Sequence, residues 1–482
     1  MNKIVAFLIA LIVSFSSINA NAQGVVYSPY EKYDVHNGSF AVVGKVGERT
    51  YVYRTSDDGY FLDAYNDNME RIATVILDFF PAKIYAASFI AYPDKIMVLY
   101  QGVEGAKLTQ YAALLDGNGK LLKRPVSIAT DHIGLFSSGR TYFSFAVSGD
   151  KKNIVVYNAD DKGDKLVANF VWLNDELQID QKAAASFDAG NDVSHGDPLI
   201  GNDGAIYFPA YTAVGGKNYA DGLWMLKLVK GEKKFTAKEF PLGDNYAGGT
   251  FMKMDNDQQR VYIGGFYSDK KNGNYQGILY ANYDLATSDF QNVKTIAFSD
   301  KLREAAGGNE KRALNNYQVK QMIIKNDGGF VLVSEDVFIT SRSSYAPGFG
   351  YYSWYYPAMA NYVREYHYDD VLCVSCDADG NIQWQSFIRK NQYSQEDNGI
   401  FSSYALINTG GALGFLFNDF NTRRSTIQLA SVEADGKVNI KSLSTQSDDP
   451  DWLPRQGKQV GAREIVIPCL RKRQICFAKV VF

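Results

Sequence analysis

The feature that most constrains this fold is a repeated pattern of short apolar runs joined by turns rich in Asp, Asn and Gly. The clearest copies are IIKNDGGFVLVSED (323–336) and DDVLCVSCDADGNIQWQSFI (369–388). Asp-Gly and Asn-Gly pairs supply the positive φ that two-residue hairpin turns require. Each copy therefore predicts one hairpin, and two successive hairpins make a unit of four antiparallel strands.

Four-stranded units of about 45–60 residues, repeated along a chain, are typical of β-propeller blades. Full blades are predicted to begin near Phe40, Ile84, Phe143, Asp197, Thr250, Tyr317 and Ser403. The last segment, EIVIPCLRKRQICFAKVVF (464–482), holds the middle strands of one more blade and lacks its outer strand. The stretch GVVYSPYEKYDV (24–35) can supply that strand, which would close the ring and hide its edges. We expect an all-β propeller of four-stranded antiparallel blades, with eight blades favoured and seven as the alternative.

The composition agrees with a β-rich globular chain. Of the 482 residues 46% are hydrophobic, and aromatic residues reach 14%, which favours strands over helices. One short helix is predicted within 299–307, capped by Ser299 or Asp300 and ended by Gly307. The net charge is -3 and no basic face is visible, so nothing indicates a nucleic-acid partner.

The first residues have the pattern of a secretory signal peptide. Lys3 precedes the apolar run IVAFLIALIV (4–13), and ANA (20–22) is a small-residue cleavage site. We expect residues 1–22 to be removed and 23–482 to form one propeller domain, exported to the periplasm, the cell surface or the extracellular space. No later stretch is long and apolar enough to suggest a membrane span.

Four cysteines fall into two pairs. Cys373 and Cys376 lie three residues apart in a predicted strand, so they should face opposite sides as buried thiols rather than form a redox or zinc site. Cys469 and Cys476 flank the predicted hairpin tip at 472–473, so they should face each other across the ladder. A disulfide between them can form after export.

Motifs for catalysis or metal binding are weak. Asp160 and Asp164 carry oxygen ligands that calcium would accept, but Asp is also what turns need, so turns are favoured and no metal or cofactor is expected. Ser194, His195 and Asp197 are too close in sequence for a triad, and we interpret them as a polar loop between blades. The segment TSDDGYF (55–61) approaches a sialidase box, but its spacing is wrong.

An aromatic-rich insertion is predicted at 340–368, between the second and third strands of the blade that begins near Tyr317. Prolines and glycines in it argue against regular structure. Tyr and Trp rings dominate recognition surfaces, so the insertion is our candidate binding site, and the alternative is a loop that covers its own blade. The candidate binding residues are Tyr345, Phe349, Tyr351, Tyr352, Trp354, Tyr355, Tyr356 and Tyr362.

The repeats NDGGFVLVSED (326–336) and DDVLCVSCDADGNIQW (369–384) resemble the DGG-strand and lDxxGNxxW repeats of secreted bacterial propellers. The whole chain, which ends in CFAKVVF (476–482), resembles an uncharacterised family of exported propeller-like proteins from Bacteroidetes-type bacteria. This resemblance implies an architecture and no reaction.

These observations favour an exported, non-enzymatic propeller that acts as a binding or scaffold protein for a protein or glycan partner in the cell envelope. The alternative is a polysaccharide hydrolase or lyase with its carboxylates in the central funnel. A third interpretation is a structural subunit of an envelope complex.

Overall fold

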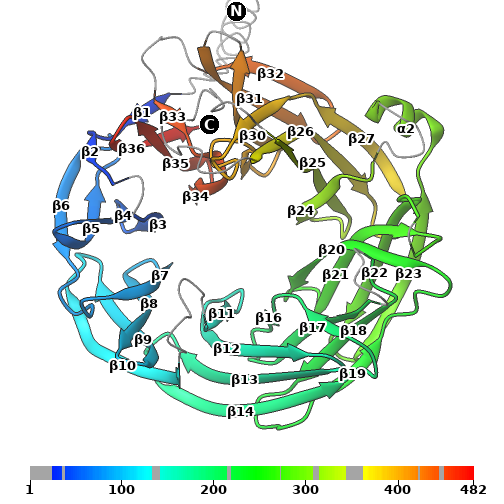
Figure 1. Cartoon of the computed structure of the whole chain (residues 1–482), viewed down its shortest axis with the longest axis horizontal. Helices are drawn as coiled ribbons and strands as arrows, with labels where there is room; N and C mark the ends of the chain where they lie inside the picture. Colours follow the sequence, from blue (N-terminus) through cyan, green and yellow to red (C-terminus); the bar gives the residue numbers. More distant parts are fainter. Residues whose placement is uncertain are drawn as a thin grey trace, which may run out of the picture.

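The computed structural model describes residues 24–34, 38–132, 142–213, 219–271, 273–307, 314–343, 362–421, 424–443 and 450–482. In this part of the chain the strands form eight antiparallel sheets arranged as the blades of a ring (Figure 1). The prediction of an eight-bladed propeller is confirmed. The predicted blade starts are close to the observed ones, because Asp-Gly turns mark where strands end.

The strands of blades 1 to 4 come in chain order. Blade 1 comprises β3 (Phe40–Val46), β4 (Arg49–Ser56), β5 (Gly59–Tyr65) and β6 (Arg71–Ile76). Blade 2 comprises β7 (Ile84–Ala91), β8 (Lys95–Glu104), β9 (Lys107–Asp116) and β10 (Leu121–His132). Blade 3 comprises β11 (Ser144–Val147), β12 (Asn153–Lys162), β13 (Lys165–Asn174) and β14 (Ile179–Asp188). Blade 4 comprises β15 (Val193–His195), β16 (Leu199–Ile200), β17 (Ile206–Thr212), β18 (Gly222–Leu228) and β19 (Thr236–Glu239).

The remaining blades follow the same order until the last one. Blade 5 comprises β20 (Tyr246–Asp255), β21 (Arg260–Ser268), β22 (Gly277–Asp284) and β23 (Asp289–Ala297). Blade 6 comprises β24 (Tyr317–Ile324), β25 (Phe330–Ser343), β26 (Tyr362–Cys376), β27 (Ile382–Ile388) and β28 (Gln392–Gln395). Blade 7 comprises β29 (Ala405–Asn408), β30 (Ala412–Asn421), β31 (Arg424–Glu433) and β32 (Val438–Ser442). Blade 8 comprises β33 (Asp451–Trp452), the 3₁₀ helix η1 (Pro454–Gln456), β34 (Lys458–Gly461), β35 (Glu464–Arg471), β36 (Gln474–Val481), β1 (Val25–Tyr27) and β2 (Glu31–Lys32).

Blade 8 closes the ring with both ends of the described chain. Strand β1 pairs antiparallel with β36, with Val25 opposite Val480, so the N-terminal stretch supplies the missing outer strand. In the neighbouring pair of strands Cys469 lies directly opposite Cys476. The predicted closure and the predicted cysteine register are therefore both confirmed.

The core lies between the faces of neighbouring blades. Cys373 packs in the apolar cluster between blades 6 and 7, whereas Cys376 packs in the cluster between blades 5 and 6. The two thiols thus face opposite sides, as predicted, and burial raises the pKa of each. Glycines in turns contribute to this packing. Gly436 adopts a φ of 85° and lies so close to the Trp384 ring that a Cβ there would be 2.7 Å from it.

The short helix α2 (Asp300–Ala306) connects blades 5 and 6. The Ser299 hydroxyl accepts a hydrogen bond from the backbone N–H of Leu302, and Gly307 follows the last turn, as the sequence predicts. Within the described residues, no helix has both the length and the apolar character needed to span a membrane.

Candidate functional site

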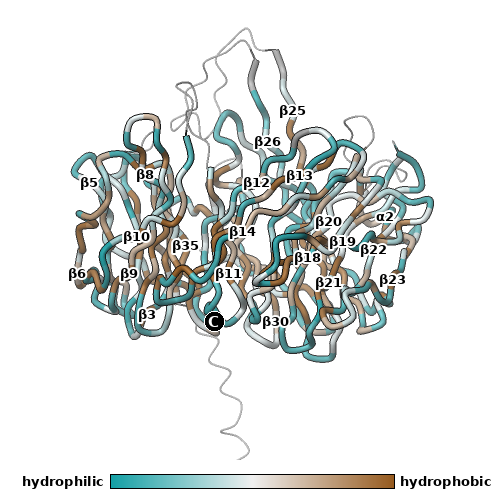
Figure 2. Tube along the Cα trace, turned by 90° about the horizontal axis from the view of Figure 1, so that it is seen from below, coloured by the Kyte–Doolittle hydropathy of each residue, from teal (hydrophilic) through white to brown (hydrophobic). Residues whose placement is uncertain are grey.

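Blade 6 carries the element that departs most from the regular blade. Its strands β25 and β26 are 14 and 15 residues long. Beyond a bulge between Glu335 and Val337 their ladder continues from Val337 opposite Tyr368 to Ser343 opposite Tyr362. Strand β28 adds a third strand alongside 365–368. Figure 2 shows this part of β25 and β26 rising above the neighbouring blades. We call residues 337–343, 362–368 and 392–395 the raised sheet.

One face of the raised sheet is buried close to the ring, whereas Ile339, which lies opposite Tyr366 on the same face, is 61% exposed. Val337, Tyr366 and Tyr368 form an apolar cluster on it. Arg455, from η1 of blade 8, donates a 2.9 Å hydrogen bond to the Tyr368 hydroxyl, and its guanidinium carbon lies 5.2 Å from the centre of that ring. The Tyr366 hydroxyl donates to Asn398 Oδ1 at 2.9 Å. This face is therefore fixed against blade 8 and against the segment that leads from blade 6 to blade 7.

The opposite face carries a row of rings. The rings of Phe338 and His367 are stacked with their centres 4.3 Å apart, and the Tyr393 ring lies 5.1 Å from His367. Glu365 accepts hydrogen bonds from the Tyr393 hydroxyl at 2.7 Å and from the Thr340 hydroxyl at 3.0 Å. Tyr393 and Thr340 are exposed. Ordered aromatic rings beside a carboxylate form a surface suited to recognition, because rings that are already ordered lose little conformational entropy when a partner binds.

A network of buried polar groups supports the raised sheet from below. The side chains of Lys390 and Glu335 are 1% and 0% exposed, and Lys390 Nζ lies 2.8 Å from Glu335 Oε1. The opposite charges of the two groups therefore lie in direct contact inside the protein. The ammonium donates to the Tyr368 carbonyl at 2.8 Å and to Gln392 Oε1 at 2.9 Å. Burial lowers the pKa of Lys390, and the charge of Glu335 opposes that shift.

The same network extends into blades 7 and 8. Glu335 Oε2 accepts from the Ser403 hydroxyl at 2.7 Å. Gln392 Nε2 donates to the Asn418 carbonyl at 2.7 Å, and Asn418 Nδ2 donates to the carbonyl of Trp452 at 2.8 Å. We call Glu335, Lys390, Gln392, Ser403 and Asn418 the polar base. Because its members come from blades 6 and 7 and from the segment between them, and Asn418 also bonds to blade 8, the polar base fixes the raised sheet relative to the ring.

An acidic pair lies at the bulge, where the raised sheet leaves the blade. Burial and then the negative charge of Asp369 raise the pKa of Asp336 to about 6. Burial also raises the pKa of Asp369. Asp370 differs, because it forms an ion pair with Arg389. A carboxyl group with a raised pKa can act as a general acid near neutral pH.

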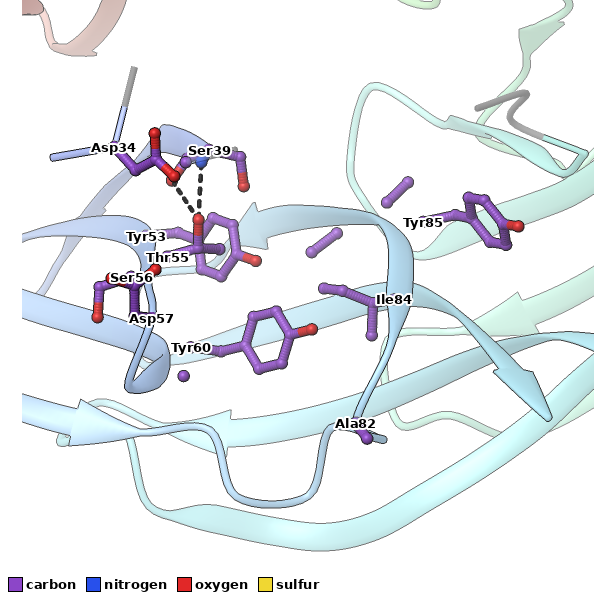
Figure 3. Close-up of a pocket in the computed structure, with 14 residues that line it drawn as sticks. Asp34, Ser39, Tyr53, Thr55, Ser56, Asp57, Tyr60, Ala82, Ile84 and Tyr85 are labelled. Carbon is purple, nitrogen blue, oxygen red and sulfur yellow. Dashed lines mark hydrogen bonds between the residues drawn. The ribbon is translucent and has the colours of Figure 1, made fainter. Parts of the chain in front are cut away.

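A cavity of about 420 Å³ opens between blades 1 and 2 (Figure 3). Tyr53 and Tyr60 contribute to its lining, whereas the ring of Tyr85, another lining residue, packs against the apolar cluster between blades 2 and 3. The end of β4 supplies Ser56, and the turn between β4 and β5 supplies Asp57. The blades repeat one topology, so the connection between the second and third strands lies on the same side of the ring in every blade. The turn between β4 and β5 and the connection between β25 and β26 are both of this kind. The cavity and the raised sheet therefore open on the same side of the propeller.

Most residues of the predicted aromatic site lie outside the described part of the chain. These are Tyr345, Phe349, Tyr351, Tyr352, Trp354, Tyr355 and Tyr356. Tyr362 begins β26. The predicted insertion at 340–368 differs from the observed structure at both ends, because 340–343 and 362–368 continue the strands of blade 6. The β-branched and aromatic content of VFITSRS (337–343) is the signal that indicates this continuation.

The weaker candidates are also located. Asp160 lies in β12, Asp164 lies in the turn that follows, and among the described residues no group of three or more His, Cys, Asp or Glu side chains is placed to hold a metal ion. Ser194 and His195 belong to β15 rather than to a loop, because they pair with β17. Asp197 accepts a hydrogen bond from the Tyr157 hydroxyl at 3.2 Å. The thiols of Cys469 and Cys476 are not bridged in the structure, so the disulfide stays a prediction.

Comparison with known proteins gives structural matches only. No protein-family model matches the chain, and no curated protein matches it. Prolyl oligopeptidase B from Galerina marginata is similar to it with 11% identity and a TM-score of 0.42, over 91% of this chain and 55% of the oligopeptidase. The chain thus spans about half the length of that enzyme.

Two further matches are a polysaccharide lyase, Uly1, and a protein of unknown function from Bacteroides caccae. The lyase is 10% identical over 82% of this chain and 89% of its own, with a TM-score of 0.42. The Bacteroides protein is 10% identical over 72% of this chain and 92% of its own, with a TM-score of 0.29. At these values none of the matches assigns an activity.

Proposed function

We propose that this protein is an exported, non-enzymatic binding or scaffold protein of the cell envelope, which recognises a protein or glycan partner through the raised sheet of blade 6 and the aromatic segment that joins its two long strands. The observation that carries the proposal is the two-faced construction of the raised sheet. Arg455 and the polar base fix one face, while the other presents the rings of Phe338, His367 and Tyr393.

The fixed face supports a role in recognition on energetic grounds. A binding surface gains affinity when its groups are ordered before the partner arrives, because less freedom is then lost on association. The ring row is ordered by stacking and by the hydrogen bonds of Glu365. A sheet that only covered its own blade would not need an ordered row of rings on its outer face.

The test is affinity capture from native envelope fractions. The variant replaces 344–361 by a short Gly-Ser turn, and Trp354→Ala and Tyr355→Ala probe the two rings that we expect to anchor the partner. Each buried aromatic anchor contributes about 2 kcal/mol or more to binding, so capture should fall strongly. Thermal stability should change little, because the polar base and the strand ladder stay intact.

Ile72→Ala is the matched control, since Ile72 is 48% exposed on β6 of blade 1, away from the raised sheet. It should capture the partner as the unaltered protein does. The proposal would be overturned if the shortened protein melted several degrees lower and still captured the same partner, because the segment would then serve only to cover its blade.

A second candidate function is hydrolysis or elimination of a polysaccharide, and the acidic pair at the bulge favours it. Asp336 has a pKa raised to about 6, and Asp336 Oδ1 and Asp369 Oδ1 are buried without a hydrogen-bond partner among the described residues. A carboxyl group of this kind can deliver a proton to a leaving oxygen. Polysaccharide depolymerisation that is lost in Asp336→Asn would favour this function over binding alone.

A further inference from the structure

We infer that the raised sheet binds an extended peptide of a protein partner, which pairs with β25 as an additional strand. The inference rests on the proposed function, because it names the class of partner that the raised sheet recognises. The site is the side of residues 337–341 that faces away from β26, and we call it the open edge. Strand addition to an exposed sheet edge is a common way of binding extended peptides.

The first strand of blade 6, β24, does not reach this part of β25. The ladder between them ends where Tyr317 lies opposite Asp336. Strand β26 pairs with the other side of 337–341, and β28 pairs with β26. Among the strands that the structure describes, none therefore pairs with the open edge. Figure 2 shows this end of β25 above the neighbouring blades.

Two hydrogen bonds establish the direction of the backbone groups. The Val337 N–H donates to the Asn316 carbonyl at 3.1 Å, on the side away from β26. The Arg364 carbonyl, opposite Ser341, accepts at 3.1 Å from the residue after β28, on the far side of β26. Successive residues of a strand direct their backbone groups to alternate sides. Ile339 and Ser341 therefore direct their N–H and C=O groups to the open edge.

The open edge lacks the features that protect the outer strand of blade 2. Its sequence, VFITS (337–341), contains no charged residue and no proline. Strand β10 also ends its sheet, and it contains Lys123, Arg124 and Pro125. Charged residues and prolines are the usual means by which proteins prevent an exposed edge from pairing with another strand. The open edge is therefore suited to accept one.

Side chains on both faces of the sheet define the peptide that fits. On one face, half-buried Phe338 stacks on His367 with ring centres 4.3 Å apart. On the other face, Ile339 is 61% exposed. The residues of an added strand would lie alternately beside Phe338 and beside Ile339. We expect aromatic or β-branched side chains at these positions of the peptide.

The form of the open edge favours a peptide over other occupants. A glycan lacks the regular alternation of N–H and C=O groups that a strand edge pairs with. Two copies of this chain that met only through 337–341 would bury far less than the roughly 1,200–2,000 Å² of a stable interface. A flexible peptide gains the same backbone hydrogen bonds and also contacts both faces of the raised sheet.

The experiment is panning of a phage-displayed library of random dodecapeptides on the purified protein, after depletion on the Ser341→Pro protein. Proline at 341 removes one N–H from the open edge and no bond to β26, and edge strands tolerate such a proline. Fluorescence anisotropy then measures the affinity of a selected synthetic peptide. Ser341→Pro should weaken binding about tenfold or more. Ser341→Ala is the matched control, since it keeps the N–H and should bind as the unaltered protein does.

Methylation of the peptide backbone gives the sharper measurement. An added strand directs every second N–H to the edge that it joins. Methylating one alternate set of peptide nitrogens should abolish binding, and methylating the other set should have little effect. This measurement uses the unaltered protein, so it holds even if thermal melting shows that proline at 341 lowers stability. Ile339→Lys, which places a charge beside the open edge, should weaken binding several-fold without disturbing the fold.

Three results would overturn the inference. The first is that no selected peptide distinguishes the unaltered protein from the Ser341→Pro and Ile339→Lys variants. The second is that both methylated sets bind equally weakly. The third is a concentration-dependent dimer in size-exclusion chromatography that Ser341→Pro abolishes, because the occupant would then be a second copy of this chain.

This inference and the proposed function fail separately. The selected peptide should still bind the protein in which 344–361 are replaced, because the open edge stays intact. If that replacement abolished capture of the envelope partner while Ser341→Pro left capture unchanged, strand addition would be refuted and the proposed function would stand. The reverse result would refute the role of 344–361 and support strand addition.

Discussion

The two junctions where distant parts of the chain meet are constructed differently. At the closure, β1 packs on β36 within an apolar cluster. The side chain of Lys479 is 3% exposed there, but the carboxylates that pair with it, Asp67 and Glu464, are 58% and 22% exposed. At the polar base, Lys390 and Glu335 are both almost fully buried. The closure gains stability from apolar burial and sheet pairing, whereas the polar base restricts which arrangement of the blades satisfies its charges. The closure holds the ring together, and the polar base orients the raised sheet relative to the ring.

The largest effect is expected at the closure. Deletion of 24–34 removes β1 and β2 and exposes the unpaired edge of β36. An open strand edge can pair with another chain, so the shortened protein should aggregate or unfold. Size-exclusion chromatography and thermal melting measure this. A monomeric product with unchanged stability would contradict the closure.

The next largest effect is expected at the polar base. Glu335→Ala or Lys390→Ala leaves one buried charge unpaired, which costs about 3–5 kcal/mol of unfolding free energy. The double variant Glu335→Gln with Lys390→Met removes both charges and should recover much of that loss. Urea unfolding measures all three variants.

Asp67→Ala is the matched control for that experiment, because Asp67 is an exposed partner of Lys479 in the closure. Exposed ion pairs contribute about 1 kcal/mol or less. If Asp67→Ala destabilised the protein as much as Lys390→Ala, the contrast between the two junctions would not hold.

A moderate effect is expected from the cysteines of blade 8. Cys469 and Cys476 are opposite each other and fully buried. A disulfide that closes so short a loop should stabilise the exported protein by about 2 kcal/mol. Thiol labelling under denaturing, non-reducing conditions should therefore modify Cys373 and Cys376 alone. Labelling of all four thiols would show that the bridge is absent and would leave the strand register unaffected.

The smallest effect is expected at the acidic pair. The pKa of Asp336 is about 6 in the folded protein, above its usual value near 4. The folded state therefore binds the Asp336 proton more tightly than the unfolded state does. The contribution of this group to the free energy of unfolding is fully present below about pH 4 and is lost as the pH rises through about 6. Asp369 and Asp370 oppose the charged form, and Lys390 favours it. The melting temperature of Asp336→Asn should be higher than that of the unaltered protein at pH 7.5 and equal to it near pH 4.

The sequence predicts the blade number because the turn signals are local, and the closure follows because the last blade lacks an outer strand that 24–35 can supply. Asp377 and Asp255 show why: each accepts hydrogen bonds from backbone N–H groups of its own turn, so the turn residues alone mark the strand ends. Both residues begin short Asp- and Asn-rich turn sequences, DADGN (377–381) and DNDQQ (255–259).

The candidate sites could not be predicted from the sequence in the same way, because they depend on contacts between segments far apart in the chain. Nothing in FVLVSED reveals that Glu335 will meet Lys390, which follows two strands later. The cavity between blades 1 and 2 is equally difficult to predict, since Tyr60 and Ile84, which line it, belong to different blades. The only sequence signal is a polar residue where an apolar one would continue the strand, as with Asn418 in LFNDF (416–420).

The pairing of β1 with β36 also has a kinetic consequence. The first strand of the described chain has its partner at the far end, so almost the whole polypeptide must be ordered before that contact forms. Contacts between such distant segments form slowly, because the intervening chain loses conformational entropy before the contact contributes favourable free energy. We therefore expect ring closure to be the late step of refolding. Until then the blades between form a crescent with two open edges, and this crescent is the state in which the protein is most vulnerable to self-association and proteolysis.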